Sequence, residues 1–181
     1  MAMTSSVVTV FGGSGFLGRH LVNRLAKQGA TVRVAIRDPE SANFMKPMGN
    51  TGQVVPMHAN INSDAQVALA CTGADIVINF VGLMSEWGKN TFQNVHVAGA
   101  ERVALAAKNA GATQFIQLSA VGASLKSESH YARTKAEGEA AVKKAFPGAS
   151  IIRPSVVFGP EDQFFNRFAG MAQLSPVLPV F

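Results

Sequence analysis

A cluster of glycines between an apolar run and an amphipathic segment constrains the fold of this chain more than any other feature. Residues 8–22 read VTVFGGSGFLGRHLV, with glycines at positions 12, 13, 15 and 18. The spacing fits both G-x-x-G-x-x-G and G-x-G-x-x-G. After a strand and before a helix, such a turn brings the backbone close to a pyrophosphate and leaves helix N-terminal amides free to bind it. The segment therefore predicts dinucleotide binding, and the alternative is a turn with a purely structural role.

Short β-branched runs alternate with longer helical patterns along most of the chain. We expect strands at residues 7–11, 31–36, 53–57, 74–82, 113–119 and 150–154. Helical patterns occupy residues 16–29, 63–73, 94–111 and 131–146. Several strands are apolar throughout, which is typical of strands buried on both faces of a parallel sheet. The alternation predicts an α/β fold with a Rossmann-like, doubly wound parallel sheet in three α/β/α layers.

Composition narrows the cellular setting and the class of ligand. The 181 residues are 48% hydrophobic, yet no apolar run reaches the roughly 20 residues of a membrane-spanning helix. No targeting segment precedes the first strand, so we expect a cytoplasmic location. The single cysteine, Cys71, excludes an internal disulfide and is interpreted as a buried hydrophobe. The net charge of +5 is scattered, which disfavours nucleic acid and is sufficient for a phosphate-bearing ligand.

The last part of the chain differs in character from the rest. Residues 161–181 are rich in Phe, Met and Pro and end on an apolar run. We expect residues 1–160 to form the NAD(P)-binding domain and residues 161–181 to begin a smaller substrate domain that this chain largely lacks. The phenylalanines Phe164, Phe165 and Phe168 lie at helical spacing and are expected to pack against that domain. The alternative is a patch that faces a membrane surface or a protein partner.

The end of the second expected strand bears on the choice of dinucleotide. NAD-binding folds place an acidic residue here to bind the ribose 2′-hydroxyl. This chain has Ile36 at that position, followed by Arg37, whose guanidinium can pair with a 2′-phosphate. NADP(H) is therefore favoured, with Arg19 as a second contact. A shift of one residue would place Asp38 there instead, so NAD(H) is the alternative.

A tyrosine and a lysine four residues apart suggest a proton-transfer site. Tyr131 and Lys135 share a face of the expected helix 131–146, and Ser119 ends the preceding strand. The carboxyl ends of parallel strands are where such sheets bind ligands, so the three side chains are expected to converge. A neighbouring ammonium should lower the pKa of the phenol, and the serine should orient a carbonyl or an alcohol. Asn94 is expected to hold a water that links Lys135 to solvent.

These motifs together resemble the short-chain dehydrogenase/reductase superfamily, in its extended and atypical branches. The matching segments are GGSGFLG, NFVG, YARTK and RPSVVFGP, with Asn94 and Ser119. More narrowly, residues 10–30, residues 151–169 and the segment SESHYARTKAEGEAAV resemble the family that contains the NADPH-binding accessory subunit of respiratory complex I and its bacterial relatives. The resemblance covers essentially the whole chain.

The resemblance implies roles for individual residues. Tyr131 would be the acid/base, Lys135 would lower its pKa and bind ribose, and Ser119 would orient the substrate. One departure is HANINSD, which replaces the usual Gly-Asp pair, so Asn60 would contact the adenine. The residues that the resemblance assigns to cofactor binding are Gly12, Gly13, Ser14, Gly15, Phe16, Leu17, Gly18, Arg37, Asn60, Ile61, Val81, Gly82, Tyr131, Lys135, Pro154 and Val156.

Two functions of different classes follow. The first is an NADP(H)-dependent oxidoreductase or epimerase-type enzyme that moves hydride between the cofactor and an unknown carbonyl or alcohol substrate. The second, which the resemblance implies, is a non-catalytic NADPH-binding accessory subunit of complex I, peripheral at the inner membrane, or a protein linked to quinone biosynthesis. A sensor of the NADP(H) redox ratio is a third, weaker hypothesis. The four histidines are dispersed without carboxylate partners, so no metal site is expected.

Overall fold

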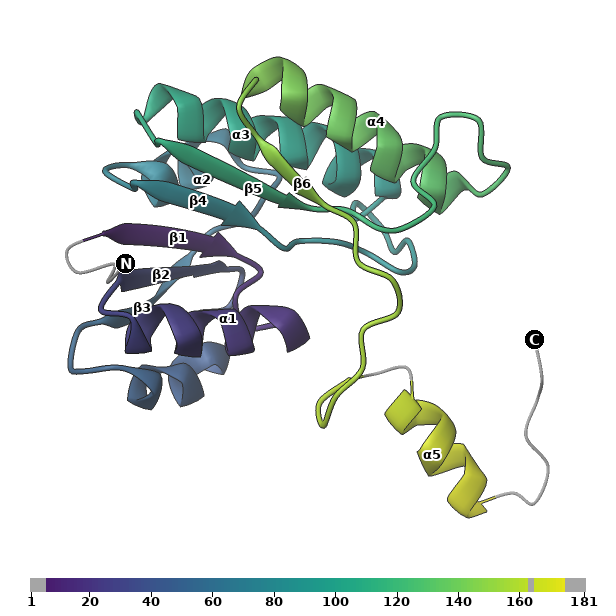
Figure 1. Ribbon diagram of the computed structural model, residues 1–181, viewed down its shortest axis with the longest axis horizontal. Helices are drawn as coiled ribbons and strands as arrows, with labels where there is room; N and C mark the ends of the chain where they lie inside the picture. Colours follow the sequence, from purple (N-terminus) through teal and green to yellow (C-terminus); the bar gives the residue numbers. More distant parts are fainter. Residues whose placement is uncertain (1–5, 163–164, 175–181) are drawn as a thin grey trace.

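A computed structural model of the chain describes residues 6–162 and 165–174. Six strands and the helices between them follow one another in the expected alternation (Figure 1). The strands are β1 (Val7–Phe11), β2 (Thr31–Ile36), β3 (Val54–His58), β4 (Ile76–Asn79), β5 (Gln114–Leu118) and β6 (Ser150–Ile152). The helices are α1 (Phe16–Lys27), η1 (Glu40–Met48), α2 (Asp64–Cys71), η2 (Gln93–Gly99), α3 (Ala100–Asn109), α4 (His130–Ala145) and α5 (Phe165–Leu174).

All six strands lie parallel in one sheet with the order β3-β2-β1-β4-β5-β6. The predicted doubly wound, Rossmann-like sheet is thereby confirmed. The strand order reverses between β1 and β4, and this switch point is where the loops after neighbouring strands diverge and leave room for a ligand. The candidate binding site is therefore expected at the carboxyl edge of the sheet, where the glycine turn follows β1.

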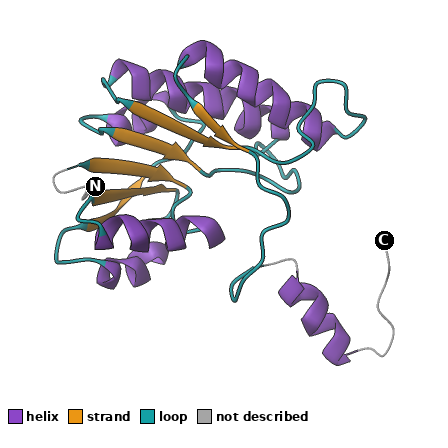
Figure 2. Ribbon diagram, viewed as in Figure 1, coloured by secondary structure: helices purple, strands orange, loops and turns teal. Residues whose placement is uncertain are grey.

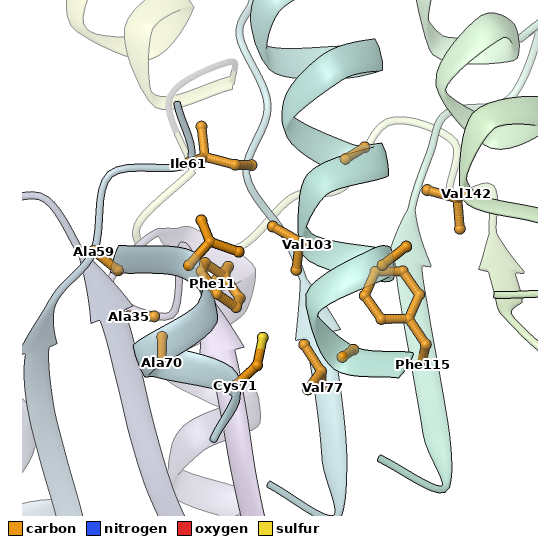
Figure 3. Packing of buried hydrophobic residues seen from close by; sticks show 14 of the residues in the cluster. Phe11, Ala35, Ala59, Ile61, Ala70, Cys71, Val77, Val103, Phe115 and Val142 are labelled. Carbon is orange, nitrogen blue, oxygen red and sulfur yellow. The ribbon is translucent and has the colours of Figure 1, made fainter. Parts of the chain in front are cut away.

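Helices cover both faces of the sheet (Figures 1 and 2). On one face, α1 and η1 pack over a cluster that contains Val10, Val34 and Met45. On the other face, α2, α3 and α4 cover a second cluster, in which Phe11 and Phe115 point from the sheet toward the helices and Val103 lies between them (Figure 3). Cys71 is fully buried in this second cluster, and burial raises the pKa of its thiol to about 12. It is therefore a packing residue, as predicted.

The fourth strand is shorter than predicted, and a buried side chain explains why. Residues 74–82 are apolar except for Asp75 and Asn79, but β4 ends at Asn79. The Asn79 side chain accepts a hydrogen bond from the Val81 amide at 3.1 Å and donates one to Gln117 at 3.0 Å. Because the amide of Val81 bonds to this side chain, the chain leaves the sheet at the candidate binding edge.

Two helical elements, η1 and η2, differ from the predicted secondary structure, and a third, α5, lies outside the three layers. The segment Glu40–Met48 forms a 3₁₀ helix, η1, which was not predicted because it contains Pro47 and shows no clear periodicity. The expected helix 94–111 begins with a π-helical segment, η2, before it becomes α3. Helix α5 extends away from the three layers (Figure 1).

Part of the predicted C-terminal segment lies outside the described residues. Phe164 belongs to that part, and so does the terminal apolar run from residue 175 to residue 181. Phe165 is half exposed and makes an edge-to-face contact with Phe158, with ring centroids 6.1 Å apart. Among the described residues, no helix is long and apolar enough to cross a membrane.

The backbones of helices α4 and η2 are in close contact. Gly138 of α4 lies against the carbonyl group of His96, and a Cβ atom at position 138 would overlap that oxygen. The obstacle is backbone, so it cannot move aside as a flexible side chain would. Glycine at this position therefore allows α4 to lie close to η2.

We expect Gly138→Ala to destabilise the protein by about 3 kcal/mol or more, because one helix must move away from the other. Urea unfolding measures the change. Gly170→Ala is the control, since a Cβ atom there meets nothing within 4 Å. Equal unfolding midpoints for both variants would contradict the close contact.

Candidate functional site

A cleft of about 370 Å³ lies at the carboxyl ends of β1, β2, β3 and β4. It opens at the switch point of the sheet, where the fold predicts a ligand. The residues that line it come from the glycine turn, from the last residues of β1 and β2, and from the segments after β2, β3 and β4 as far as η2. They are Phe11, Gly12, Ser14, Gly15, Ala35, Ile36, Arg37, Asp38, Ser41, Ala59, Asn60, Ile61, Phe80, Val81, Gly82, Leu83, Asn90 and Val95.

The glycine turn connects β1 to α1 with backbone atoms in close contact. Gly12 has a φ of +72°, and a Cβ atom there would lie 3.1 Å from the amide nitrogen of Val81. At Gly18, a Cβ atom would lie 2.6 Å from both the Gly12 oxygen and the Gly13 Cα. Helix α1 can therefore begin directly over the end of β1 only because these side chains are absent.

The start of α1 can accept an anion. Its N-cap residue, Gly15, provides no side-chain hydrogen bond, and the first turn contains no acidic residue. The first amides of a helix lack partners within the helix, and the helix dipole favours negative charge there. Gly12, Ser14 and Gly15 line the cleft beside these amides. The local geometry thus fits a pyrophosphate.

Several predicted cofactor residues lie at the turn without lining the cleft. Gly13 and Gly18 are buried where α1 packs on the strands. Phe16 and Leu17 open α1 and are partly exposed. For Gly18, the close approach of backbone atoms is a sufficient structural reason for a glycine.

Arg37 and Asp38 both line the cleft, but their side chains are held differently. The Asp38 carboxylate accepts a hydrogen bond from the Glu40 amide at 3.2 Å, at the start of η1. The exposed Arg37 guanidinium makes no hydrogen bond or ion pair with any residue in the described part of the chain. The cation is thus available to a ligand, whereas the acid is partly engaged. Ser41, which the sequence did not single out, lines the cleft beside them.

Asn60 and Ile61 line the opposite wall, after β3. The Asn60 side-chain oxygen accepts a hydrogen bond from the Asn62 amide at 3.0 Å, which holds the loop before α2 in a turn. The side-chain amide group of Asn60 makes no hydrogen bond within the described residues. This arrangement is compatible with the predicted adenine contact.

The tyrosine and the lysine occupy one face of α4. Tyr131 is partly buried, and its ring makes edge-to-face contacts with Phe92 and His96, at centroid distances of 5.8 and 5.4 Å. Lys135 is 7% exposed, and its amino group donates a hydrogen bond to the Leu118 carbonyl at 2.8 Å, at the end of β5. Both residues therefore lie at the carboxyl edge of the sheet.

The expectation that the pKa of the Tyr131 phenol is lowered was wrong. Burial raises the pKa of Tyr131 above its ordinary value of 10.0, although a neighbouring ammonium was expected to lower it. Burial also lowers the pKa of Lys135 from 10.5 to about 8, and the charge of Glu139 opposes that change. The Tyr131 phenol is therefore protonated at neutral pH. Lys135 is a cation there, but it loses its proton more readily than an ordinary lysine.

Ser119 does not face Tyr131 with a free hydroxyl group. It is buried, and its Oγ donates a hydrogen bond to the Glu139 carboxylate. Arg153 binds the same carboxylate through Nε at 2.8 Å and Nη2 at 2.5 Å. The Ser119 hydroxyl, which was predicted to orient the substrate, is thus hydrogen-bonded to Glu139, which Arg153 also binds. The sequence did not predict this role for Glu139 and Arg153. Pro154 and the exposed Val156 follow Arg153 on the chain and do not line the cleft.

Asn94 is likewise placed differently from the prediction. It is exposed, and its side-chain amide donates a hydrogen bond to the Lys89 carbonyl at 3.0 Å. No hydrogen bond joins it to Lys135 within the described residues. The prediction rested on the position of Asn94 at the start of the long helix, and there, in η2, its side chain is exposed at the surface.

His96 occupies the position between cleft and tyrosine instead. Its Nε2 accepts a hydrogen bond from the Leu83 amide at 3.0 Å, so Nδ1 carries the proton and faces Thr134 Oγ1 at 3.1 Å. Burial and the nearby charge of Lys135 lower the pKa of His96 to about 4. Because Leu83 lines the cleft, this neutral imidazole connects the cleft wall to Tyr131.

Comparison with known proteins identifies similar sequences and folds. A family model described as NAD(P)H-binding matches residues 12–160. The chain is 39% identical to the mitochondrial NADH dehydrogenase [ubiquinone] 1 alpha subcomplex subunit 9 of Arabidopsis thaliana, over 99% of this chain and 45% of that protein. It is 37% identical to the ceramide reductase of Caulobacter vibrioides, over 96% of this chain and 53% of that protein.

The chain spans about half the length of these curated relatives. Among solved structures, a Bacillus halodurans protein assigned to the NAD-dependent epimerases/dehydratases has a TM-score of 0.72 at 22% identity. That likeness covers 88% of this chain and 74% of the other, and it shows the fold alone.

The neutral state of His96 leads to a prediction about acid stability. Its pKa falls from 6.5 in the unfolded chain to about 4 in the fold, so unfolding takes up a proton between these values. We expect the free energy of unfolding to decrease by roughly 2–3 kcal/mol as the pH falls from 6.5 to 4. In His96→Gln this part of the pH profile should flatten, whereas exposed His58→Gln should leave it unchanged. Chemical denaturation at each pH tests this, and parallel profiles for wild type and His96→Gln would contradict it.

Proposed function

This chain belongs to the NAD(P)H-binding family, as an extended short-chain dehydrogenase/reductase-like protein, and we propose that it is an NADP(H)-dependent oxidoreductase with Tyr131 as its acid. The observation that carries the proposal is the position of Tyr131 and Lys135 relative to the cleft. His96 contacts both Tyr131 and the cleft residue Leu83, so the phenol lies one side chain away from the cofactor cleft.

The residues of the cleft fit a dinucleotide. A Cβ atom at Gly12 or Gly18 would crowd the turn beside the amides of α1, which would bind the pyrophosphate. Arg37 would pair with a 2′-phosphate, and its lack of a partner within the described residues supports NADP(H) over NAD(H). Asp38 is partly engaged at η1, which makes it the weaker candidate for a ribose contact.

The proton chemistry follows from the two side chains on α4. When bound, a reduced nicotinamide supplies hydride to a carbonyl carbon. The protonated phenol of Tyr131 would then donate a proton to the carbonyl oxygen. Lys135, one helical turn away on α4, would be the cation that stabilises the phenolate as it forms. Burial of Lys135 strengthens this electrostatic effect because little water screens it.

A second candidate function is an accessory subunit that binds NADPH without turnover. Two observations favour it: the Ser119 hydroxyl is held by Glu139, and the chain is 39% identical to a subunit of NADH dehydrogenase. In that role the nucleotide would stabilise the fold, and a ligand at 100 times its Kd contributes about 2.7 kcal/mol. The protein would then act beside a respiratory complex at the inner membrane, whereas the enzyme would be cytoplasmic.

We expect Arg37→Ala to weaken NADPH binding by about 10- to 100-fold, because it removes a charged hydrogen bond to the 2′-phosphate. NADH binding should change less than about threefold. Fluorescence titration of the full-length protein with both nucleotides measures the effect. Arg24→Ala, which removes an exposed arginine at the other end of α1, is the matched control. Equal losses for NADPH and NADH would contradict the assignment of Arg37.

We expect Tyr131→Phe to reduce NADPH oxidation by about 10²- to 10⁴-fold, because the phenol is the proton donor. The Kd for NADPH should change less than about threefold. The assay uses full-length protein and carbonyl compounds that include quinones and ceramide-type substrates. Tight NADPH binding by the wild type with no turnover on any of them would contradict the enzymatic proposal and favour the accessory subunit.

A further inference from the structure

The buried carboxylate of Glu139 connects helix α4 to the chain that follows β5 and to the chain that follows β6. The Glu139 side chain is 7% exposed and accepts hydrogen bonds from Ser119 at the end of β5 and from Arg153 after β6. We call Ser119, Glu139 and Arg153 the Glu139 cluster. A buried carboxylate is expensive unless it is paired, and this one is bound by two side chains.

The Glu139 cluster is fixed relative to the tyrosine and the lysine by helix geometry. Tyr131, Lys135 and Glu139 follow one another at intervals of four residues on α4, so they lie along one face. Lys135 also donates to the Leu118 carbonyl, next to Ser119 on the chain. Glu139 and Lys135 thus bind adjacent residues at the end of the same strand.

The Glu139 cluster also holds the chain that leaves β6. The Ser119 amide donates to the Ile152 carbonyl at 2.7 Å, and the Val121 amide donates to the Pro154 carbonyl at 2.9 Å. Arg153 lies between these two backbone bonds and reaches back to α4 through Glu139. The segment from Arg153 to Val156, which was predicted to flank the cofactor, is therefore anchored at its start by this carboxylate.

The charges around Lys135 give the carboxylate an electrostatic role. Within the described residues, the titratable groups that interact with Lys135 are Glu139 on α4 and the neutral His96 on η2, and Arg153 acts through Glu139. Tyr131 lies one helical turn before Lys135 on α4. Burial by itself would raise the pKa of Glu139, but the bonds from Arg153 and Ser119 outweigh it and keep the pKa below its ordinary value. Glu139 is thus an anion at neutral pH, and its charge opposes the loss of the proton from Lys135.

We propose that Glu139 is a positioning residue for the site, which keeps Lys135 charged beside Tyr131 and anchors Ser119 and Arg153 as structural partners. The inference rests on the proposed function for its consequence in turnover, but its tests do not require turnover. It also gives Ser119 a role different from substrate orientation, because the hydroxyl is bound to the carboxylate.

The test is the pKa of Lys135, measured by NMR on lysine-labelled full-length protein, together with the Kd for NADPH between pH 6 and 9.5. Glu139→Gln should lower the pKa of Lys135 by about one pH unit, and the pH above which NADPH affinity falls should decrease with it. Arg153→Gln should move both quantities upward, because the charge of Glu139 is then no longer compensated. Glu137→Gln, two residues away on the same helix, should change neither.

Ser119→Ala separates the two roles of the serine. If Ser119 belongs to the Glu139 cluster, its effect on NADPH affinity should be non-additive with that of Glu139→Gln in the double variant. Additive effects, with Ser119→Ala changing only the KM of a substrate, would overturn its assignment to the cluster.

An unchanged pKa of Lys135 in both Glu139→Gln and Arg153→Gln would overturn the proposal. If Glu139→Gln fails to fold, Arg153→Gln decides alone, because Arg153 is half exposed and its replacement is better tolerated. An unchanged pKa of Lys135 in that variant would then overturn the proposal. Failure of NADPH to bind would count against the proposed function, whereas the NMR titration would still decide the role of Glu139.

Discussion

The backbone contact between Gly18 and the turn at Gly12 and Gly13 is the constraint on which the rest of the site depends. It places the first turn of α1 over the end of β1 and leaves its amides open to the cleft. The same turn brings Gly12 against Val81, so the loop after β4 forms the facing wall. A side chain at either glycine would separate α1 from the strand and remove the anion site together with the cleft.

The strands and their order could be predicted because their causes are local or general. β1 and β2 were predicted to the residue, since most of their residues are apolar or β-branched and buried. The crossover rule then fixes a parallel arrangement. The η1 and η2 segments could not be predicted in the same way. η2 lies against α4 at Gly138, and no periodicity within residues 94–111 carries information about that contact or about the helix type.

The candidate site was predictable where its residues are close in sequence. The glycine turn and the pair Tyr131 and Lys135 were predicted from their spacing together with the strand and helix patterns around them. Ser119 was placed correctly at the end of a strand, but its hydrogen-bond partner lies twenty residues away on the sequence, and its orientation depends on that partner. His96 and Thr134 are thirty-eight residues apart, so the histidine carried no local signal. Helical spacing from Lys135 would have pointed to Glu139, had buried charge been considered.

The close contact of α4 with η2 has a practical consequence for anyone who modifies this protein. One side of α4 packs through Gly138 against the carbonyl group of His96. This contact fixes the position of α4, so that position does not depend on the side chains of its opposite side. Ala140, Lys143 and Lys144 are exposed on that opposite side. Probes, crosslinkers or solubilising charges introduced there should leave Tyr131 and Lys135 undisturbed, which makes this surface suitable for immobilisation or labelling.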